Sequence, residues 1–257
     1  MHGHRARKRF GQNFLADTHY IQRIVDAVAP RPGDNLVEIG PGLGALTHRL
    51  IERAKRITAI EIDRDLAARL RETYGPEQLV LHEGDALAFD FATLGENLRV
   101  VGNLPYNISS PLLFHLAGFD ARLLDVHVML QREVVMRMGA APGTPDYGRL
   151  SVMLQARFSV TRLFVIPPGA FQPAPKVDSA FVRLEPLGAA RPTISDERLF
   201  SQVVSAAFGQ RRKTLRNALA SLCDEDTMQG VGIDPGARGE TLSVLAFVNL
   251  ANALALR

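Results

Sequence analysis

Short apolar runs alternate with segments of helical periodicity along much of the chain. The strand-like runs are NLVEIG (35–40), RITAIEI (56–62), QLVLHEG (78–84), LRVVGN (98–103) and DVHVMLQ (125–131). Apolar residues recur at helical spacing between them, in LGALTHRLIERA (43–54), RDLAARLRETY (64–74) and SSPLLFHLAGF (109–119). This alternation predicts an α/β fold, with a mostly parallel sheet and helices on both of its faces.

The alternation changes in the second half of the chain. Two strand-like runs, RFSVTRLFVI (157–166) and SAFVRLEPL (179–187), are joined by a proline-rich loop with no helical segment between them. We therefore expect a mixed edge, where one antiparallel strand is added to the parallel sheet. The segment GAAPGTPDYGR (139–149) has the composition of a loop, which is either a lid or a plain surface connection.

Strand patterns stop near residue 190. Ser195 and Asp196 are typical of a helix start, and helical periodicity follows in residues 196–209, 213–223 and 241–256. We therefore predict two domains, an α/β domain over residues 1–190 and a small helical domain over residues 191–257.

Cysteine and hydropathy patterns narrow the class of protein. The single cysteine, Cys223, excludes an intramolecular disulfide framework and a cysteine-ligated zinc cluster, so we expect a cytoplasmic protein. The apolar runs are all well short of the roughly twenty residues of a membrane span. His2 and His4 are interpreted as tail residues, and the other histidines show no ligand spacing, so no metal site is predicted.

Basic residues are clustered although the net charge is only +3. One cluster contains Arg7, Lys8 and Arg9, and the other contains Arg211, Arg212, Lys213 and Arg216. Two such clusters and a pI near 9.3 favour a nucleic-acid partner, with solvated surface charge as the alternative.

The glycine-rich segment EIGPGLG (38–44) follows the first strand of the sheet and opens the next helix. Gly40 and Gly42 allow a ligand to approach the backbone at the carboxyl end of the sheet, where open α/β folds bind ligands. Gly40, Gly42 and Ala45 also fit the dinucleotide pattern G-x-G-x-x-A, so an NAD enzyme has to be considered.

Three carboxylates lie at the ends of successive predicted strands. Glu38 precedes the glycines, Glu61 ends the second strand and Asp85 ends the third. Glu61 is placed to accept from ribose hydroxyls and Asp85 from an adenine amino group. A pyrophosphate gains nothing from Glu38, whereas a ligand with a sulfonium and an ammonium group does. Together they favour S-adenosylmethionine over NAD, although each alone is explained equally well as a cap or turn residue.

The strand LRVVGN is followed directly by Leu104, Pro105 and Tyr106. An asparagine and a tyrosine around a Leu-Pro pair indicate fixed hydrogen-bonding groups beside a ring suited to stacking. The alternative is an ordinary turn, which needs only Asn or Pro.

Several motifs together resemble the KsgA family of bacterial ribosomal RNA adenine N6,N6-dimethyltransferases. They are RKRFGQNFLAD, EIGPGLGALT, EIDRDL, GDAL, GNLPYNISSPLLFHL, MLQREVV, YGRLSVM, FQPAPKVDSAFVRL and FGQRRKTLRNAL. The macrolide-resistance Erm methyltransferases share the first domain, but FGQRRKTLRNAL and the C-terminal layout are closer to the KsgA family. The resemblance implies a Rossmann-like class I methyltransferase sheet followed by a helical, RNA-binding C-terminal domain. It also implies dimethylation of two adjacent adenines near the 3′ end of 16S rRNA, within an immature small ribosomal subunit.

The resemblance also assigns site residues. The family's cofactor contacts carry over to Asn13, Leu15, Gly40, Glu61, Asp85 and Asn103. The catalytic set is expected to be Asn103, Leu104, Pro105, Tyr106 and Phe171, and the RNA phosphates are expected to meet the two basic clusters.

An exocyclic adenine amine is a weak nucleophile because its lone pair is delocalised into the ring. Hydrogen bonds from the amine to the Asn103 side-chain oxygen and the Leu104 carbonyl would direct that lone pair at the methyl group. Pro105 would hold the Leu104 carbonyl in a fixed direction. Tyr106 would stack on one face of the base and Phe171 on the other.

Two alternatives remain open from the sequence. An NAD-dependent oxidoreductase is disfavoured by Glu38 and by the lack of an obvious catalytic His or Lys. An RNA-binding ribosome assembly factor without catalysis is disfavoured by the intact NLPY motif and the three carboxylates. We expect no membrane partner, no obligate protein partner and a monomer.

Overall fold

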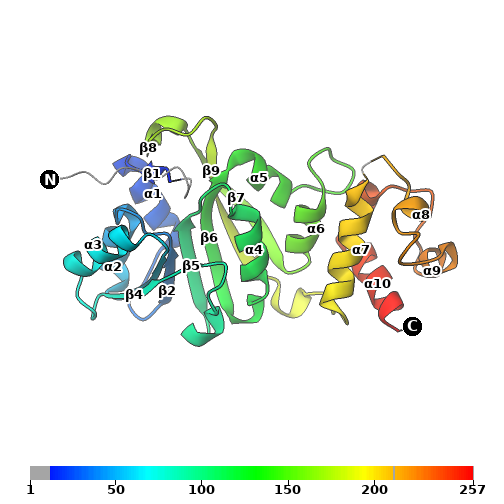
Figure 1. The fold of residues 1–257 in the computed structure, drawn as a ribbon, viewed down its shortest axis with the longest axis horizontal. Helices are drawn as coiled ribbons and strands as arrows, with labels where there is room; N and C mark the ends of the chain where they lie inside the picture. Colours follow the sequence, from blue (N-terminus) through cyan, green and yellow to red (C-terminus); the bar gives the residue numbers. More distant parts are fainter. Residues whose placement is uncertain (1–11, 211, 257) are drawn as a thin grey trace. The chain divides into compact units, whose positions relative to one another are not determined.

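The computed structural model describes residues 12–210 and 212–256 of the chain (Figure 1). The chain divides into two compact units, Met1–Val135 with Thr161–Pro186, and Met136–Val160 with Leu187–Arg257. The second unit therefore includes residues 136–160, which the sequence assigned to the first domain. The assignment of separate roles to residues 1–190 and 191–257 stays a prediction.

The first unit is built on a seven-stranded sheet. Its spatial order is β4 (Leu79–Glu83), β3 (Ile57–Glu61), β2 (Asn35–Ile39), β5 (Leu98–Asn103), β6 (Leu123–Gln131), β9 (Ser179–Pro186) and β7 (Phe158–Ile166). Strands β2 to β6 pair in parallel, and β9 runs antiparallel to β6. The predicted α/β class with one antiparallel strand is confirmed. That strand lies inside the sheet, because β7 takes the edge beyond it.

Helices connect the parallel strands as the pattern predicts. They are α2 (Ala45–Ala54), α3 (Arg64–Thr73) and α4 (Ser109–Ala117), with α1 (Thr18–Val28) before β2 and α5 (Arg132–Met138) after β6. Asp17 begins α1 because its side chain accepts hydrogen bonds from the backbone N–H groups of His19 and Tyr20. Helix α1 ends at Ala29, which has a left-handed backbone (φ 47°).

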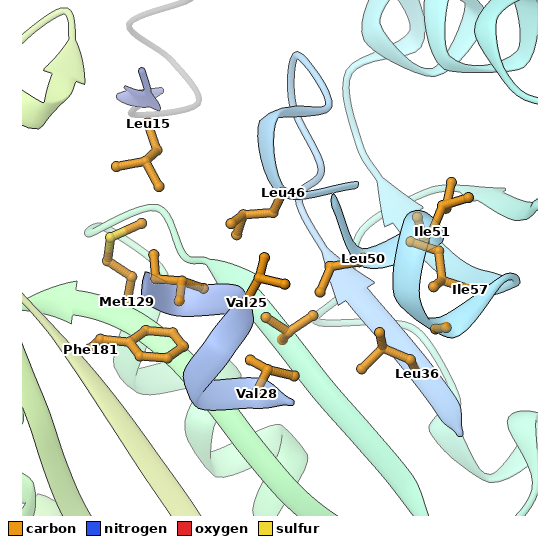
Figure 2. Packing of buried hydrophobic residues seen from close by; sticks show 14 of the residues in the cluster. Leu15, Val25, Val28, Leu36, Leu46, Leu50, Ile51, Ile57, Met129 and Phe181 are labelled. Carbon is orange, nitrogen blue, oxygen red and sulfur yellow. The ribbon is translucent and has the colours of Figure 1, made fainter. Parts of the chain in front are cut away.

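The core of the first unit lies between α1, α2 and the sheet. Val25 and Val28 of α1 point into the space that also holds Leu36 of β2 and Leu50 of α2 (Figure 2). These side chains are at most 2 % exposed, so the helical periodicity of α1 and α2 is satisfied by burial against one sheet face.

A two-residue antiparallel ladder pairs the segment before α1 with a segment after β7. Strand β1 (Phe14–Leu15) pairs antiparallel with β8 (Phe171–Gln172), with Leu15 opposite Phe171. The backbone N–H of Ala16 extends this pairing by donating to the Ala170 carbonyl at 2.8 Å. Strands this short leave no periodic signal, so the sequence did not predict them.

The second unit is helical. It contains α6 (Arg149–Gln155), α7 (Glu197–Gly209), α8 (Leu215–Ala218), α9 (Glu225–Gly230) and α10 (Val244–Ala255). Asp196 begins α7 as predicted, accepting from the N–H groups of Arg198 and Leu199. The helix predicted over 213–223 was wrong in extent, because Asp224 already begins α9 and the chain has to turn after Leu219. Of the helices in the described ranges, none is long and apolar enough to cross a membrane.

Gly102 lies where β5 approaches β2 most closely. A Cβ atom at this position would lie 2.5 Å from the Ile39 carbonyl oxygen and 3.2 Å from the Leu104 side chain. Because backbone on a central strand cannot move away, we expect Gly102→Ala to lower the free energy of unfolding by about 1–3 kcal/mol. Urea unfolding measures it.

Gly84, in the turn directly after β4, provides the matched control. A Cβ at Gly84 meets nothing within 4 Å, so Gly84→Ala should change stability by less than about 0.5 kcal/mol. Equal effects of the two substitutions would contradict the steric argument.

Candidate cofactor and substrate site

A cavity of about 290 Å³ opens at the carboxyl ends of β2, β3 and β5 and at the turn after β4. It lies wholly in the first unit. Among its lining residues are most of those that the sequence selected: Asn13, Leu15, Glu38, Gly40, Gly42, Glu61, Asp85, Asn103, Leu104, Pro105 and Tyr106. The fold therefore brings together residues that are far apart in sequence, such as Asn13 and Asn103, which are ninety positions apart.

The glycine turn forms one wall of this cavity. Gly40 and Gly42 have left-handed backbones, with φ of 66° and 60°. A Cβ on Gly42 would also lie 3.1 Å from the ring of Phe14. Glycine is therefore required at position 42 both by conformation and by the close approach of the β1 segment.

The Glu61 carboxylate organises the turn. It is 4 % exposed and accepts from the N–H of Gly42 at 3.0 Å and from the N–H of Asp63 at 2.9 Å. Burial raises its pKa, and the two backbone hydrogen bonds oppose that rise. Each oxygen still has lone-pair capacity toward the cavity, so binding a ribose is compatible with this structural role.

Glu38 is a buried carboxyl group, only 1 % exposed. Its Oε2 accepts from the Thr47 hydroxyl at 2.7 Å. The pKa of Glu38 is raised to about 8, mainly by burial and further by the neighbouring Glu61 carboxylate, while the hydrogen bond from Thr47 opposes the rise. The group is thus suited to a cation, which would supply the counter-charge that it lacks.

Asp85 lies at the exposed rim of the cavity. Its Oδ1 accepts from the N–H of Leu87 at 2.9 Å, which is the turn role that the sequence left as an alternative. Asp85 also lines the cavity, so the turn role and the predicted cofactor contact are compatible.

Asn103 ends β5 with a fixed amide orientation. Its Nδ2 donates to the Asn13 backbone carbonyl at 2.8 Å. Since a carbonyl only accepts, the nitrogen has to face Asn13, and Oδ1 is the acceptor that remains. The sequence did not predict this contact, which makes the segment before α1 a support for the predicted catalytic side chain.

The residues after Asn103 are held by neighbouring strands. The Leu104 N–H donates to the Met129 carbonyl at 3.2 Å, and the Leu104 side chain is buried. Within the described ranges, no group donates to the Leu104 carbonyl. The Tyr106 hydroxyl shares a hydrogen bond of 2.6 Å with the Ser179 hydroxyl. The turn therefore presents a backbone acceptor and a ring with a fixed hydroxyl end.

The structure does not bring Phe171 to the cavity, so its predicted stacking role stays a prediction. Phe171 is 2 % exposed, belongs to the core of the first unit and does not line the cavity. Its pairing with Leu15 in the β1–β8 ladder turns the ring inward, so in this structure it offers no face to a base.

The basic clusters are only partly described. Arg7, Lys8, Arg9 and Arg211 lie outside the described residues. Arg212, Lys213 and Arg216 are exposed in the second unit, and Arg216 Nε lies 3.2 Å from Glu225 Oε1. Arg212 and Lys213 precede the short α8, so they occupy a turn and not the helix face that the periodicity suggested.

Three supporting residues were missed from the sequence. Thr47 bonds Glu38, Gln12 Nε2 donates to Asp63 Oδ2 at 3.3 Å, and Ser179 bonds Tyr106. Each lies inside a motif already quoted. The partners of Gln12 and Ser179 are distant in sequence, and no periodic pattern indicates any of the three contacts.

The sheet with its antiparallel β9, and the cavity over a glycine turn and buried carboxylates, define a class I methyltransferase fold. Among solved structures, a dimethyladenosine transferase from Plasmodium falciparum superposes with a TM-score of 0.76 at 25% identity, covering 92% of this chain and 95% of that one. The 23S rRNA methyltransferase ErmE superposes with a TM-score of 0.68 at 28% identity, covering 95% of this chain and 100% of that one.

Sequence comparison gives the family. The model of the ribosomal RNA adenine dimethylase family matches residues 3–256, and the chain belongs to that family. It is 63% identical over 257 residues to a ribosomal RNA small subunit methyltransferase A of Aromatoleum aromaticum, covering 100% of this chain and 97% of the relative. The corresponding protein of Thiobacillus denitrificans is 56% identical over 254 residues, covering 99% and 100%. The resemblance identified from the motifs is confirmed.

Glu38 should make stability depend on pH in the cofactor-free protein. Its folded pKa of about 8 lies above the ordinary 4.5, so the folded chain holds the extra proton between these values. The stability from this group is complete below pH 4.5 and is lost as pH rises through 8. We expect the free energy of unfolding of wild type, relative to Glu38→Gln, to fall by up to about 1.4 kcal/mol per pH unit in this window.

Urea unfolding of both proteins at several pH values tests this expectation. Glu38→Gln keeps an acceptor for Thr47 and remains neutral, so it is the matched control for shape. Parallel pH profiles for the two proteins would show that Glu38 is already ionised in the folded state.

Proposed function

We propose that the chain transfers methyl groups from S-adenosylmethionine to the N6 amino groups of two adjacent adenines near the 3′ end of 16S rRNA, in the small ribosomal subunit. The observation that carries the proposal is the pair of acceptors at the cavity. Asn103 is oriented with Oδ1 as its remaining acceptor, and the adjacent Leu104 carbonyl has no donor among the described residues.

The cavity fits the cofactor chemically. Glu38 is a buried carboxyl group with no cationic partner, and Glu61 has acceptor capacity beside it. Among the described residues that line the cavity there is no Lys, Arg or His, and Glu38 lies beside the glycine turn, a set that suits a cationic ligand better than the pyrophosphate of the NAD alternative. Glu61 would hold the ribose, Asp85 the adenine, and Glu38 the cationic methionine portion. When bound, S-adenosylmethionine supplies an electrophilic methyl group.

The chain's task is then to expose the lone pair of the target amine. Asn103 Oδ1 and the Leu104 carbonyl would accept its two hydrogens, which favours a pyramidal nitrogen with its lone pair directed at the methyl group. Pro105 restricts Leu104 to extended geometry and so fixes the carbonyl direction. Positioning of this kind gives effective molarities of about 10⁵ M or more. As the N–C bond forms and the sulfonium C–S bond breaks, the amine nitrogen would become positively charged and acidic, so it would lose its proton to water and no strong general base is needed.

The target base has to leave its stack to reach Asn103. Tyr106 would receive it by stacking, a contact worth roughly 1–3 kcal/mol. Phe171 is buried and does not line the cavity. The other aromatic ring in the described lining is that of Phe14, which lies against Gly42 in the glycine turn. We therefore assign the stacking role to Tyr106 alone.

Asn103→Ala should slow methyl transfer by about 10²–10³-fold, because one preorganised acceptor is lost. RNA affinity should change little, since phosphate contacts lie elsewhere. The measurement is single-turnover methylation of unmethylated small subunits with saturating S-adenosylmethionine, followed by nucleoside analysis. A wild-type rate for folded Asn103→Ala would refute the proposed mechanism.

The exposed cations before and in α8 should bind RNA phosphates. Lys213→Ala or Arg216→Ala should weaken RNA binding and reduce the slope of log affinity against log salt by about 0.7–0.9 per lost contact. Affinity for S-adenosylmethionine should not change.

Arg49→Ala is the control for a loss of one surface charge. Arg49 is exposed, is bonded to Glu52 at 2.9 Å and belongs to the first unit. If all three substitutions leave the salt slope at its wild-type value, Lys213 and Arg216 are solvated surface charges.

A further inference from the structure

We infer that Ser179 is a positioning residue, which holds the Tyr106 ring, by its hydroxyl end, in the position that the second methyl transfer requires. This inference rests on the proposed function. The Ser179 hydroxyl lies in the FQPAPKVDSAFVRL motif and takes no part in the mechanism proposed above.

Ser179 is rigid and completely buried. It is 0 % exposed and opens β9, where it lies opposite Gln131, the last residue of β6. The N–H of Arg132 continues this pairing by donating to the Asp178 carbonyl at 2.9 Å. The backbone that carries the Ser179 hydroxyl is therefore held by its pairing with β6 and by this neighbouring hydrogen bond.

Tyr106 is held at both ends by this arrangement. Its backbone follows Pro105, whose carbonyl accepts from the Ile108 N–H at 3.2 Å and from the Ser109 hydroxyl at 3.0 Å. Its hydroxyl bonds Ser179 at 2.6 Å. The Cβ atom and the hydroxyl oxygen of a tyrosine lie on one axis of the ring. A ring with only its Cβ end fixed can swing, whereas fixing the hydroxyl end as well fixes the position of this axis and leaves only rotation about it.

The sheet register links the support of the Tyr106 ring to Asn103. Asn103 lies opposite Met129 on β6, and Ser179 lies opposite Gln131 two residues further along the same strand. Strand β6 thus sets both the acceptor for the amine and the support for the stacking ring. A base held between them is positioned by one rigid element.

The second methyl transfer should depend on this support more than the first. An unmethylated amine has two hydrogens for Asn103 Oδ1 and the Leu104 carbonyl, whereas a monomethylated amine has one. With one orienting hydrogen bond lost, the stacking contact between the base and the Tyr106 ring has to supply a larger part of the orientation. Loss of the Ser179 hydroxyl should therefore slow the second transfer selectively.

The test is a double-mutant cycle of Ser179→Ala and Tyr106→Phe. Single-turnover reactions on unmethylated small subunits, with saturating S-adenosylmethionine, are stopped over time and analysed for N6-methyl- and N6,N6-dimethyladenosine. For each single variant we expect the second transfer to slow by about tenfold and the first by less than about threefold. Monomethyladenosine should accumulate, and the double variant should be no slower than either single variant.

Ser151→Ala is the control for loss of a buried hydroxyl. Ser151 is also 0 % exposed, and its hydroxyl donates to the Arg137 carbonyl in the second unit. It should lower stability without changing the ratio of the two products. Tyr106→Phe tests the same hydrogen bond without altering β9, so it decides the matter if Ser179→Ala does not fold.

Three results would overturn the inference. They are wild-type rates for both transfers in the single variants, equal slowing of both transfers, or a double variant slowed by the product of the single effects. Failure of the proposed function is distinct, because the wild-type protein itself would then form no dimethyladenosine.

Discussion

The Glu61 carboxylate joins the two turns from which the cofactor side of the cavity is built. It bonds the N–H of Gly42 after β2 and the N–H of Asp63 after its own strand, β3. These turns meet because parallel neighbours end at one edge of the sheet, where the Gly40 N–H still pairs with the Ile60 carbonyl at 2.9 Å. Burying a carboxylate is unfavourable unless donors surround it. The two backbone N–H groups meet that requirement, and the glycine turn is consequently fixed by the residue expected to bind the ligand.

The other side of the cavity is held by neutral groups. Asn103 bonds the Asn13 backbone and Tyr106 bonds Ser179, so the residue before β1 and the first residue of β9 support the two ends of the NLPY turn. This division has a chemical reason. A cationic cofactor is favoured by Glu38 and Glu61, whereas an adenine amine needs uncharged acceptors that leave its lone pair available.

The sequence predicted the regular elements well because β2 to β6 and α2 to α4 repeat apolar residues at strand and helix periods. It also predicted the cavity residues that follow those strands, since a strand end in a parallel sheet has only one place to lie. Contacts between distant segments were not predictable in this way. Asn13 bonds Asn103 through its backbone carbonyl, which every residue type carries. Phe171 was assigned to the substrate from its motif, but the two-residue ladder with Leu15 buries it, and so short a ladder has no pattern.

The acidic lining also constrains how the reaction gains its rate. Methyl transfer moves a positive charge from the sulfonium to the amine nitrogen. The described cavity lining offers Glu38, Glu61, Asp85 and Tyr106 as its titratable groups. Carboxylates beside the cavity favour the cation before and after the transfer, so they contribute to binding more than to the difference between ground state and transition state. Selective stabilisation has to come from groups that act on the amine itself. In the proposed mechanism Asn103 and Leu104 would act there, and both are already held without substrate, Asn103 by the Asn13 carbonyl and Leu104 by the Met129 carbonyl of β6.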